Sequence, residues 1–118
     1  MPLEKQGVLD LMDGETELAP GVTAFPTPGH TPGHMSLLVA SKNERALLVG
    51  DILGSPMHAT ETDLHYSPDW DGPMGIAARK NILDQAELTH AVVMGSHLSY
   101  PGWGTMIRWE GKRYWKAL

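Results

Sequence analysis

The segment from Pro26 to Ser36, PTPGHTPGHMS, holds His30 and His34 four positions apart. On a helix this spacing would place two metal ligands on one face. A helix is excluded here, because the segment also contains two Pro-Gly pairs, Pro28-Gly29 and Pro32-Gly33. The two histidines therefore lie on a turn, where one imidazole faces forward and the second can stand behind it as an orienting partner.

Two further candidates share one feature with His30: Asp51 and His97 also follow the end of an apolar segment, across a Gly or a Gly-Ser step. Functional groups gather beyond strand ends, where the backbone is rigid and side chains reach open space. We therefore expect the three side chains to converge. Two imidazoles and a carboxylate suit zinc, manganese or iron, and a carboxylate can bridge two ions.

The chemistry that such a set predicts is metal-assisted hydrolysis. A bound metal lowers the pKa of its water to about 7 in the best cases and polarises a carbonyl or phosphoryl oxygen. Each residue also has a plainer interpretation, because a histidine after a strand is often an ordinary loop residue and Gly-Asp is often only a turn. Their joint occurrence with PGHTPGH favours the metal site.

The elements that must position these residues form a mixed α and β fold. Val8 to Met12 and Glu15 to Leu18 flank Asp13-Gly14, which predicts a tight hairpin, and Ala19-Pro20-Gly21 turns the chain into the next strand. Apolar segments predict further strands at Val22 to Phe25, Met35 to Ala40, Arg45 to Val49 and His90 to Gly95, and a closing hairpin of Met106 to Trp109 with Lys112 to Trp115.

One helix is predicted after a long loop. The loop runs from Ile52 to Trp70 without a sustained hydrophobic period, and its length suggests a functional role. Asp71 then has the position of an N-cap, with Pro73 in the first turn. The expected apolar stripe of this helix is Met74, Ala78, Ile82 and Ala86.

Composition narrows the function classes. The 118 residues, 42% of them hydrophobic, fit one globular domain. The net charge of −5 and the scattered basic residues speak against a nucleic-acid surface. No apolar stretch of about eighteen residues predicts a membrane span, so we expect a cytoplasmic protein. Because the chain has no cysteine, any metal must be held by histidine and carboxylate.

Three motifs give the chain a family resemblance. TPGHTPGHMS, LLVGD and VVMGSHL resemble the third, fourth and fifth metal motifs of the metallo-β-lactamase-fold hydrolases, in the right order. Their candidate ligands are 21 and 46 residues apart. The segments PDWDGPMGIAARKNIL and GSHLSYPGWGTMIRWEGKRYW are most similar to the branch that holds methyl parathion hydrolase-like and lactonase-like enzymes.

The resemblance implies a role for each matching residue. His30 would bind the first metal, His97 the second, and Asp51 would be the bridging and catalytic carboxylate. His34 matches the second histidine of the third motif and would support the site from behind; the alternative is a buried loop histidine. The cofactor implied is zinc, or manganese or iron, with two ions in the complete family site.

The loop after Asp51 lies where the relatives place substrate-facing groups. It contains several polar and aromatic residues, namely His58, His65, Tyr66, Asp69 and Trp70. Of these, His58, Tyr66 and Trp70 are the candidates for substrate binding. The alternative for each is an ordinary polar surface loop.

The chain departs from the family pattern in one respect, because it contains no His-X-His-X-Asp-His motif. By resemblance, residues 1–118 form a single partial domain, the C-terminal half of an αββα sandwich without the N-terminal half. Such a half would expose an apolar sheet face. A second copy is the simplest cover, so we expect a homodimer through that face.

Two functions follow from the sequence. The first is a metal-dependent hydrolase that cleaves a small-molecule ester, lactone or phosphotriester through a metal-bound hydroxide, incomplete as an isolated chain. The second is a catalytically inactive half-domain that self-associates and binds metal weakly or not at all. A His-X-His-X-Asp-His frame encoded directly upstream would favour the first.

Overall fold

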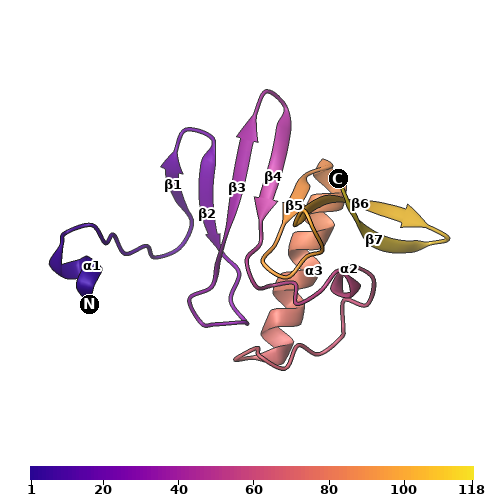
Figure 1. Cartoon of the computed structure of the whole chain (residues 1–118), viewed down its shortest axis with the longest axis horizontal. Coiled ribbons are helices and arrows are strands. Elements are labelled where there is room, and N and C mark those ends of the chain that lie inside the picture. The colour runs from indigo at the N-terminus through magenta and orange to yellow at the C-terminus, as the bar shows by residue number, and fades with distance from the viewer.

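The computed structural model describes residues 1–118 as one seven-stranded sheet with two of the three helices, α2 and α3, on one side (Figure 1). The sheet order is β1-β2-β3-β4-β5-β6-β7, and only β4 and β5 pair in parallel. The elements are α1 (Pro2–Lys5), β1 (Thr16–Ala19), β2 (Val22–Pro26), β3 (Met35–Ser41), β4 (Glu44–Leu48), α2 (Met57–Thr60), α3 (Gly72–Thr89), β5 (Val92–Met94), β6 (Trp103–Trp109) and β7 (Lys112–Ala117). The mixed α and β fold is confirmed.

Four strands of this sheet, β2, β4, β5 and β7, run in the same direction. Because β3 is antiparallel to both β2 and β4, the strands β2 and β4 are parallel to each other. The crossover through α3 then brings β5 parallel to β4, with Leu47 opposite Val93. The C-terminal ends of β2, β4 and β5 therefore meet at one edge of the sheet. The loops that follow these three strands carry His30, Asp51 and His97.

The hydrophobic core lies between the sheet and the two helices α2 and α3. Side chains alternate along each strand, so one face of the sheet turns its apolar residues toward the helices. Trp115 of β7 closes this core, and its Nε1 donates a hydrogen bond to the Val93 carbonyl at 3.3 Å. The buried cluster contains Leu47, Val49, Ile52, Leu53, Ala59, Ile82, Leu83, Ala86, Ala91, Val93, Leu98 and Trp115.

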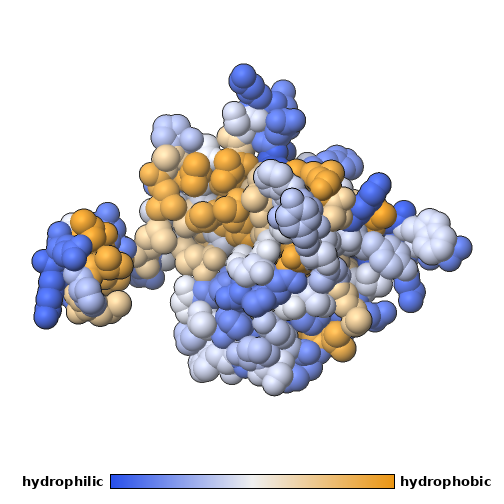
Figure 2. All heavy atoms as spheres, viewed as in Figure 1, coloured by the Kyte–Doolittle hydropathy of each residue, from blue (hydrophilic) through white to orange (hydrophobic).

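The opposite face of the sheet has no helix on it. The register places Leu37, Leu48 and Met94 in one row across β3, β4 and β5, and Val39, Ala46 and Val92 in the next. All six are only partly buried. Figure 2 shows apolar side chains gathered over strands β2 to β4. We call these six residues the open face.

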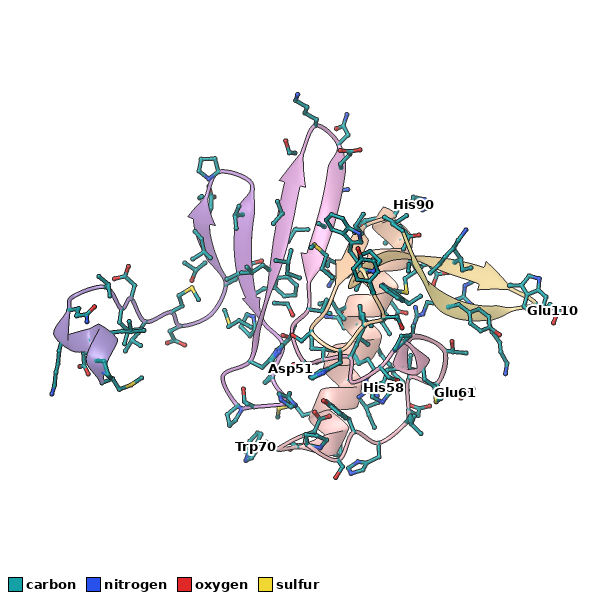
Figure 3. The ribbon with its side chains drawn as sticks, in the orientation of Figure 1. Asp51, His58, Glu61, Trp70, His90 and Glu110 are labelled. Carbon is teal, nitrogen blue, oxygen red and sulfur yellow. The ribbon has the colours of Figure 1, made fainter.

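Helix α3 begins as predicted. Asp71 is its N-cap and accepts a hydrogen bond from the Met74 amide at 2.9 Å. The end of the helix differs from the prediction, because His90 does not open a strand. It is the left-handed C-cap of α3, with φ of 55°, and β5 starts at Val92. Figure 3 places His90 and Asp51 at opposite ends of the sheet.

The predicted apolar stripe of α3 is only partly right. Ile82 and Ala86 are buried, but Met74 is 39% exposed. The buried positions are Gly75, Arg79, Ile82, Leu83 and Ala86. The predicted stripe was misplaced because two buried positions in the first two turns are Gly75 and Arg79, which are not apolar side chains.

The N-terminal hairpin prediction is wrong. Residues 8–13 form no strand, and Leu11 is 90% exposed. The turn at Pro20-Gly21 instead pairs β1 with β2, and β3 takes the other edge of β2. Both edges of β2 are therefore occupied. Figure 1 shows α1 at the end of an extended segment, away from the sheet.

The loop from Ile52 to Trp70 contains one element that the sequence did not predict. This is the short helix α2, which packs its Ala59 into the core. None of the helices combines the length and the apolar composition needed to cross a membrane.

Candidate metal centre

The structure brings His30, Asp51 and His97 together at one edge of the sheet. Asp51 lies between the two imidazoles, with its Oδ1 2.9 Å from His97 Nε2 and its Oδ2 3.6 Å from His30 Nε2. Asp51 and His97 are partly exposed, and His30 is more enclosed. Each carboxylate oxygen thus faces one ring nitrogen.

This donor set fits one part of a two-ion centre. No group of three or more His, Cys, Asp or Glu side chains surrounds a single point where an ion would sit. The three residues instead make two His–Asp pairs that share Asp51. A carboxylate with one oxygen toward each imidazole is suited to bridge two ions, and imidazole and carboxylate are both ordinary zinc ligands. Their assignment as metal ligands stays a prediction.

His34 lies behind Asp51, where it supports the backbone. Its Nε2 accepts a hydrogen bond from the Asp51 amide at 3.2 Å. Since that nitrogen is the acceptor, the neutral ring carries its proton on Nδ1, which lies 2.9 Å from Thr27 Oγ1. Burial, and then the nearby His30, lower the pKa of His34, which favours this neutral form. The ring thus fixes the chain at Asp51.

His30 is held by a residue that the sequence did not single out for this purpose. Its Nδ1 lies 3.1 Å from Asp69 Oδ1, and the Asp69 side chain is only 3% exposed. The backbone adds two bonds, from the Trp70 amide to the His30 carbonyl at 3.1 Å and from the Asp71 amide to the Gly29 carbonyl at 3.0 Å. The histidine turn is therefore clamped to the start of α3.

Two glycines make this clamp sterically feasible. A Cβ on Gly29, whose φ is 143°, would lie 2.3 Å from the Cα of Gly75 in α3. A Cβ on Gly75 would lie 2.5 Å from Asp69 Oδ2. Backbone and carboxylate can approach each other this closely only where the side chain is missing.

The predicted substrate-binding residues do not share one environment. Tyr66 stacks on His30 with ring centroids 5.6 Å apart and planes 16° apart, and its edge contacts with His58 and His97 are at 5.6 and 6.4 Å. Burial, and then Asp51 and Asp69, raise the pKa of Tyr66, so its hydroxyl is protonated. Tyr66 lies beside the candidate ligands.

His58 and Trp70 differ from Tyr66. His58 is buried, and its Nδ1 accepts a hydrogen bond from the Gly54 amide at 2.9 Å. Trp70 is 61% exposed, and Figure 3 shows it at the outer edge of the loop. His65 is exposed as well. The structure therefore places one of the three predicted substrate-binding side chains directly against the centre.

Comparisons with known proteins match this chain to one superfamily. A family model described as the metallo-beta-lactamase superfamily matches residues 2–100. An N-acyl homoserine lactonase from a Bacillus species is 44% identical over 39 residues, which are 33% of this chain and 16% of that protein. The N-acyl homoserine lactonase of Bacillus cereus is 41% identical over 39 residues, with the same coverage.

Two solved structures share the fold over most of this chain. AidC, a dizinc quorum-quenching lactonase in complex with a product, superposes with a TM-score of 0.83 and 30% identity. The match covers 94% of this chain and 38% of AidC. AbOPH, a hydrolase of the beta-lactamase superfamily, has a TM-score of 0.80 and 24% identity, covering 97% of this chain and 39% of that one. The chain thus spans well under half of each.

Proposed function

The chain belongs to the metallo-beta-lactamase superfamily, and on that premise we propose that it supplies three ligands to a metal-dependent hydrolase site. The observation that carries the proposal is the position of Asp51, whose two oxygens face His97 and His30 at 2.9 and 3.6 Å. Zinc is the proposed metal, because the donor set suits it and AidC is described as a dizinc enzyme.

When bound, zinc would supply Lewis acidity and an acidified water at this edge. The residues of the chain have separate tasks. His30 and His97 present Nε2 toward Asp51. His34 holds the Asp51 amide. The protonated Tyr66 hydroxyl, beside the centre, donates a hydrogen bond to a carbonyl or phosphoryl oxygen of the substrate.

A lactone is the proposed substrate class, ahead of an aryl ester or a phosphotriester. The relatives support this class, because the two Bacillus proteins and AidC are all described as lactonases. A lactone is hydrolysed at one carbonyl group. That carbonyl would be polarised by the proposed zinc, and the Tyr66 hydroxyl would donate a hydrogen bond to its oxygen. His58 and Trp70 remain candidates for contacts farther from that carbonyl.

The first prediction concerns zinc. Titration of the ¹⁵N-histidine-labelled chain with zinc sulfate should shift the imidazole signals of His30 and His97 before those of His65 and His90, because His30 and His97 face a carboxylate, Asp51, that can share the ion. Asp51→Asn should remove the selectivity. The proposal fails if zinc shifts all six histidines equally, or if Asp51→Asn leaves the selective shifts unchanged.

A second prediction concerns assembly, for which we propose a two-fold homodimer through the open face. The row Leu37, Leu48 and Met94 crosses the middle of the sheet, and a two-fold interface is the commonest way to cover such a surface. Stable interfaces bury about 1,000 Å² or more.

The proposed compartment is the cytoplasm.

Sedimentation at micromolar concentration should return a dimer, and Leu48→Glu should return a monomer because it places a charge in the interface. Leu88→Glu is the matched control, since Leu88 is 82% exposed on α3, on the other side of the sheet. A monomeric wild-type chain, or a Leu48→Glu chain that is still dimeric, would exclude this interface.

A further inference from the structure

We propose that Asp69 and Arg79 form a buried pair that positions His30, with Asp69 fixing the proton of the imidazole on Nδ1 and Arg79 fixing Asp69 and its loop. The pair takes no part in the ligand set described above. It acts through His30, so both are positioning residues. The relevance to metal binding rests on the proposed function, but the geometry does not.

The hydrogen bond between His30 and Asp69 can run in only one direction. A carboxylate oxygen only accepts, so His30 Nδ1 must donate across the 3.1 Å contact. The neutral ring then has a lone pair on Nε2, the nitrogen that faces Asp51. A carboxylate behind a ligating histidine commonly fixes both its tautomer and its orientation.

The guanidinium of Arg79 lies beside Asp69 and holds it in place. The Asp69 side chain is 3% exposed and its Oδ2 lies 4.0 Å from Nη2 of Arg79, whose side chain is fully buried. A buried carboxylate without a cation nearby would be costly. Nη2 makes no hydrogen bond, and it is the buried side-chain nitrogen left without a partner. The Asp69 carboxylate is therefore the group that offsets the positive charge at Nη2 of Arg79.

The same guanidinium also binds three carbonyls of the loop from Ile52 to Trp70. Nη1 of Arg79 donates to the carbonyls of Thr62 and Leu64, both at 2.8 Å, and Nε donates to the Ile52 carbonyl at 3.3 Å. Ile52 follows Asp51 directly, and Leu64 lies two residues before Tyr66. One side chain thus holds this loop next to Asp51, near Tyr66 and at Asp69, the partner of His30.

The test is the tautomer of His30 in the full chain without metal. Long-range ¹H–¹⁵N correlation at a pH of about 8.5, where an ordinary imidazole is neutral, distinguishes a proton on Nδ1 from one on Nε2. His30→Gln assigns the signals. We expect His30 in the Nδ1–H form, whereas an unrestrained imidazole prefers the proton on Nε2.

Asp69→Asn should shift the His30 proton toward Nε2, because the amide can both donate and accept and no longer selects one form. Asp63→Asn is the control: it makes the same charge change in the same loop, at an exposed residue that pairs with Lys80. Circular dichroism reports whether each variant folds. If Asp69→Asn does not fold, the wild-type tautomer alone decides.

A wild-type His30 with its proton on Nε2, or an unchanged tautomer in a folded Asp69→Asn chain, would overturn the inference. The tautomer measurement and the zinc titration can fail independently of each other. A chain in the Nδ1–H form that shows no selective zinc shifts retains the positioning pair and loses the metal site. The reverse result retains the metal site and loses the pair.

Discussion

Replacing Arg79 with methionine is expected to lower the free energy of unfolding by about 3–5 kcal/mol, the usual cost of removing one partner from a buried ion pair. Methionine nearly preserves the volume, so the loss comes from electrostatics and hydrogen bonds. Asp69 would remain 3% exposed without its cation. The carbonyls of Ile52, Thr62 and Leu64 would lose their donors.

Urea unfolding followed by circular dichroism measures this loss. Lys80→Met is the matched control, since Lys80 is the next residue on α3 and makes an exposed pair with Asp63 that is worth about 1 kcal/mol or less. An equal loss of unfolding free energy in the two variants would show that the buried contacts of Arg79 stabilise the fold no more than an exposed ion pair does. The double variant Asp69→Asn with Arg79→Met should lose less than the sum of the single variants, because the two residues share one interaction.

The burial of Arg79 was not predicted from the sequence. The predicted stripe of α3 followed apolar residues alone, so an arginine at a buried position was passed over. A cation spaced with Gly75, Ile82 and Leu83 on the core-facing side is itself a signal, because a buried arginine requires carboxylate or carbonyl partners. Which partners it finds depends on how the loop from Ile52 to Trp70 folds back, and no local pattern encodes that.

The candidate ligands were predictable for a physical reason. His30, Asp51 and His97 follow strands that run in one direction, so their convergence depends only on strand order. Asp69 is different, since it lies 39 residues after His30 and reaches it only because Gly29 and Gly75 let the histidine turn contact α3. Convergence of strand ends can be deduced from apolar segments, but contact between a loop and a helix cannot.

The N-terminal error has a related origin. Asp13-Gly14 is a good turn by itself, and Pro20-Gly21 is another only seven residues later. Turn chemistry alone does not say which of two turns closes a hairpin. The structure closes it at Pro20-Gly21, where β1 pairs with β2. Residues 8–12 do not join the free outer edge of β1, and Leu11 is left 90% exposed.

Replacing Asp51, the proposed ligand that both ions share, with alanine is expected to raise the zinc concentration needed for half-saturation of the His30 and His97 shifts by at least about 100-fold. The loss of an outer partner of a metal ligand already costs about 10–100-fold, and the loss of a ligand should cost no less. The measurement is the zinc titration of the labelled chain. His65→Ala, which removes an exposed histidine beside Gly72 at the start of α3, should leave the half-saturation point unchanged.

The same ligand count predicts the catalytic behaviour of the 118-residue chain. With Asp51 shared between two ions, His30 and His97 leave each ion only two protein ligands, whereas catalytic zinc sites use three. We therefore expect little zinc-dependent hydrolysis of lactone, aryl ester or phosphotriester by this chain alone. Robust hydrolysis that disappears in His97→Ala would contradict this. It would mean that an assembly of copies provides the missing ligands, in which case Leu48→Glu, which separates the proposed dimer, should abolish the activity as well.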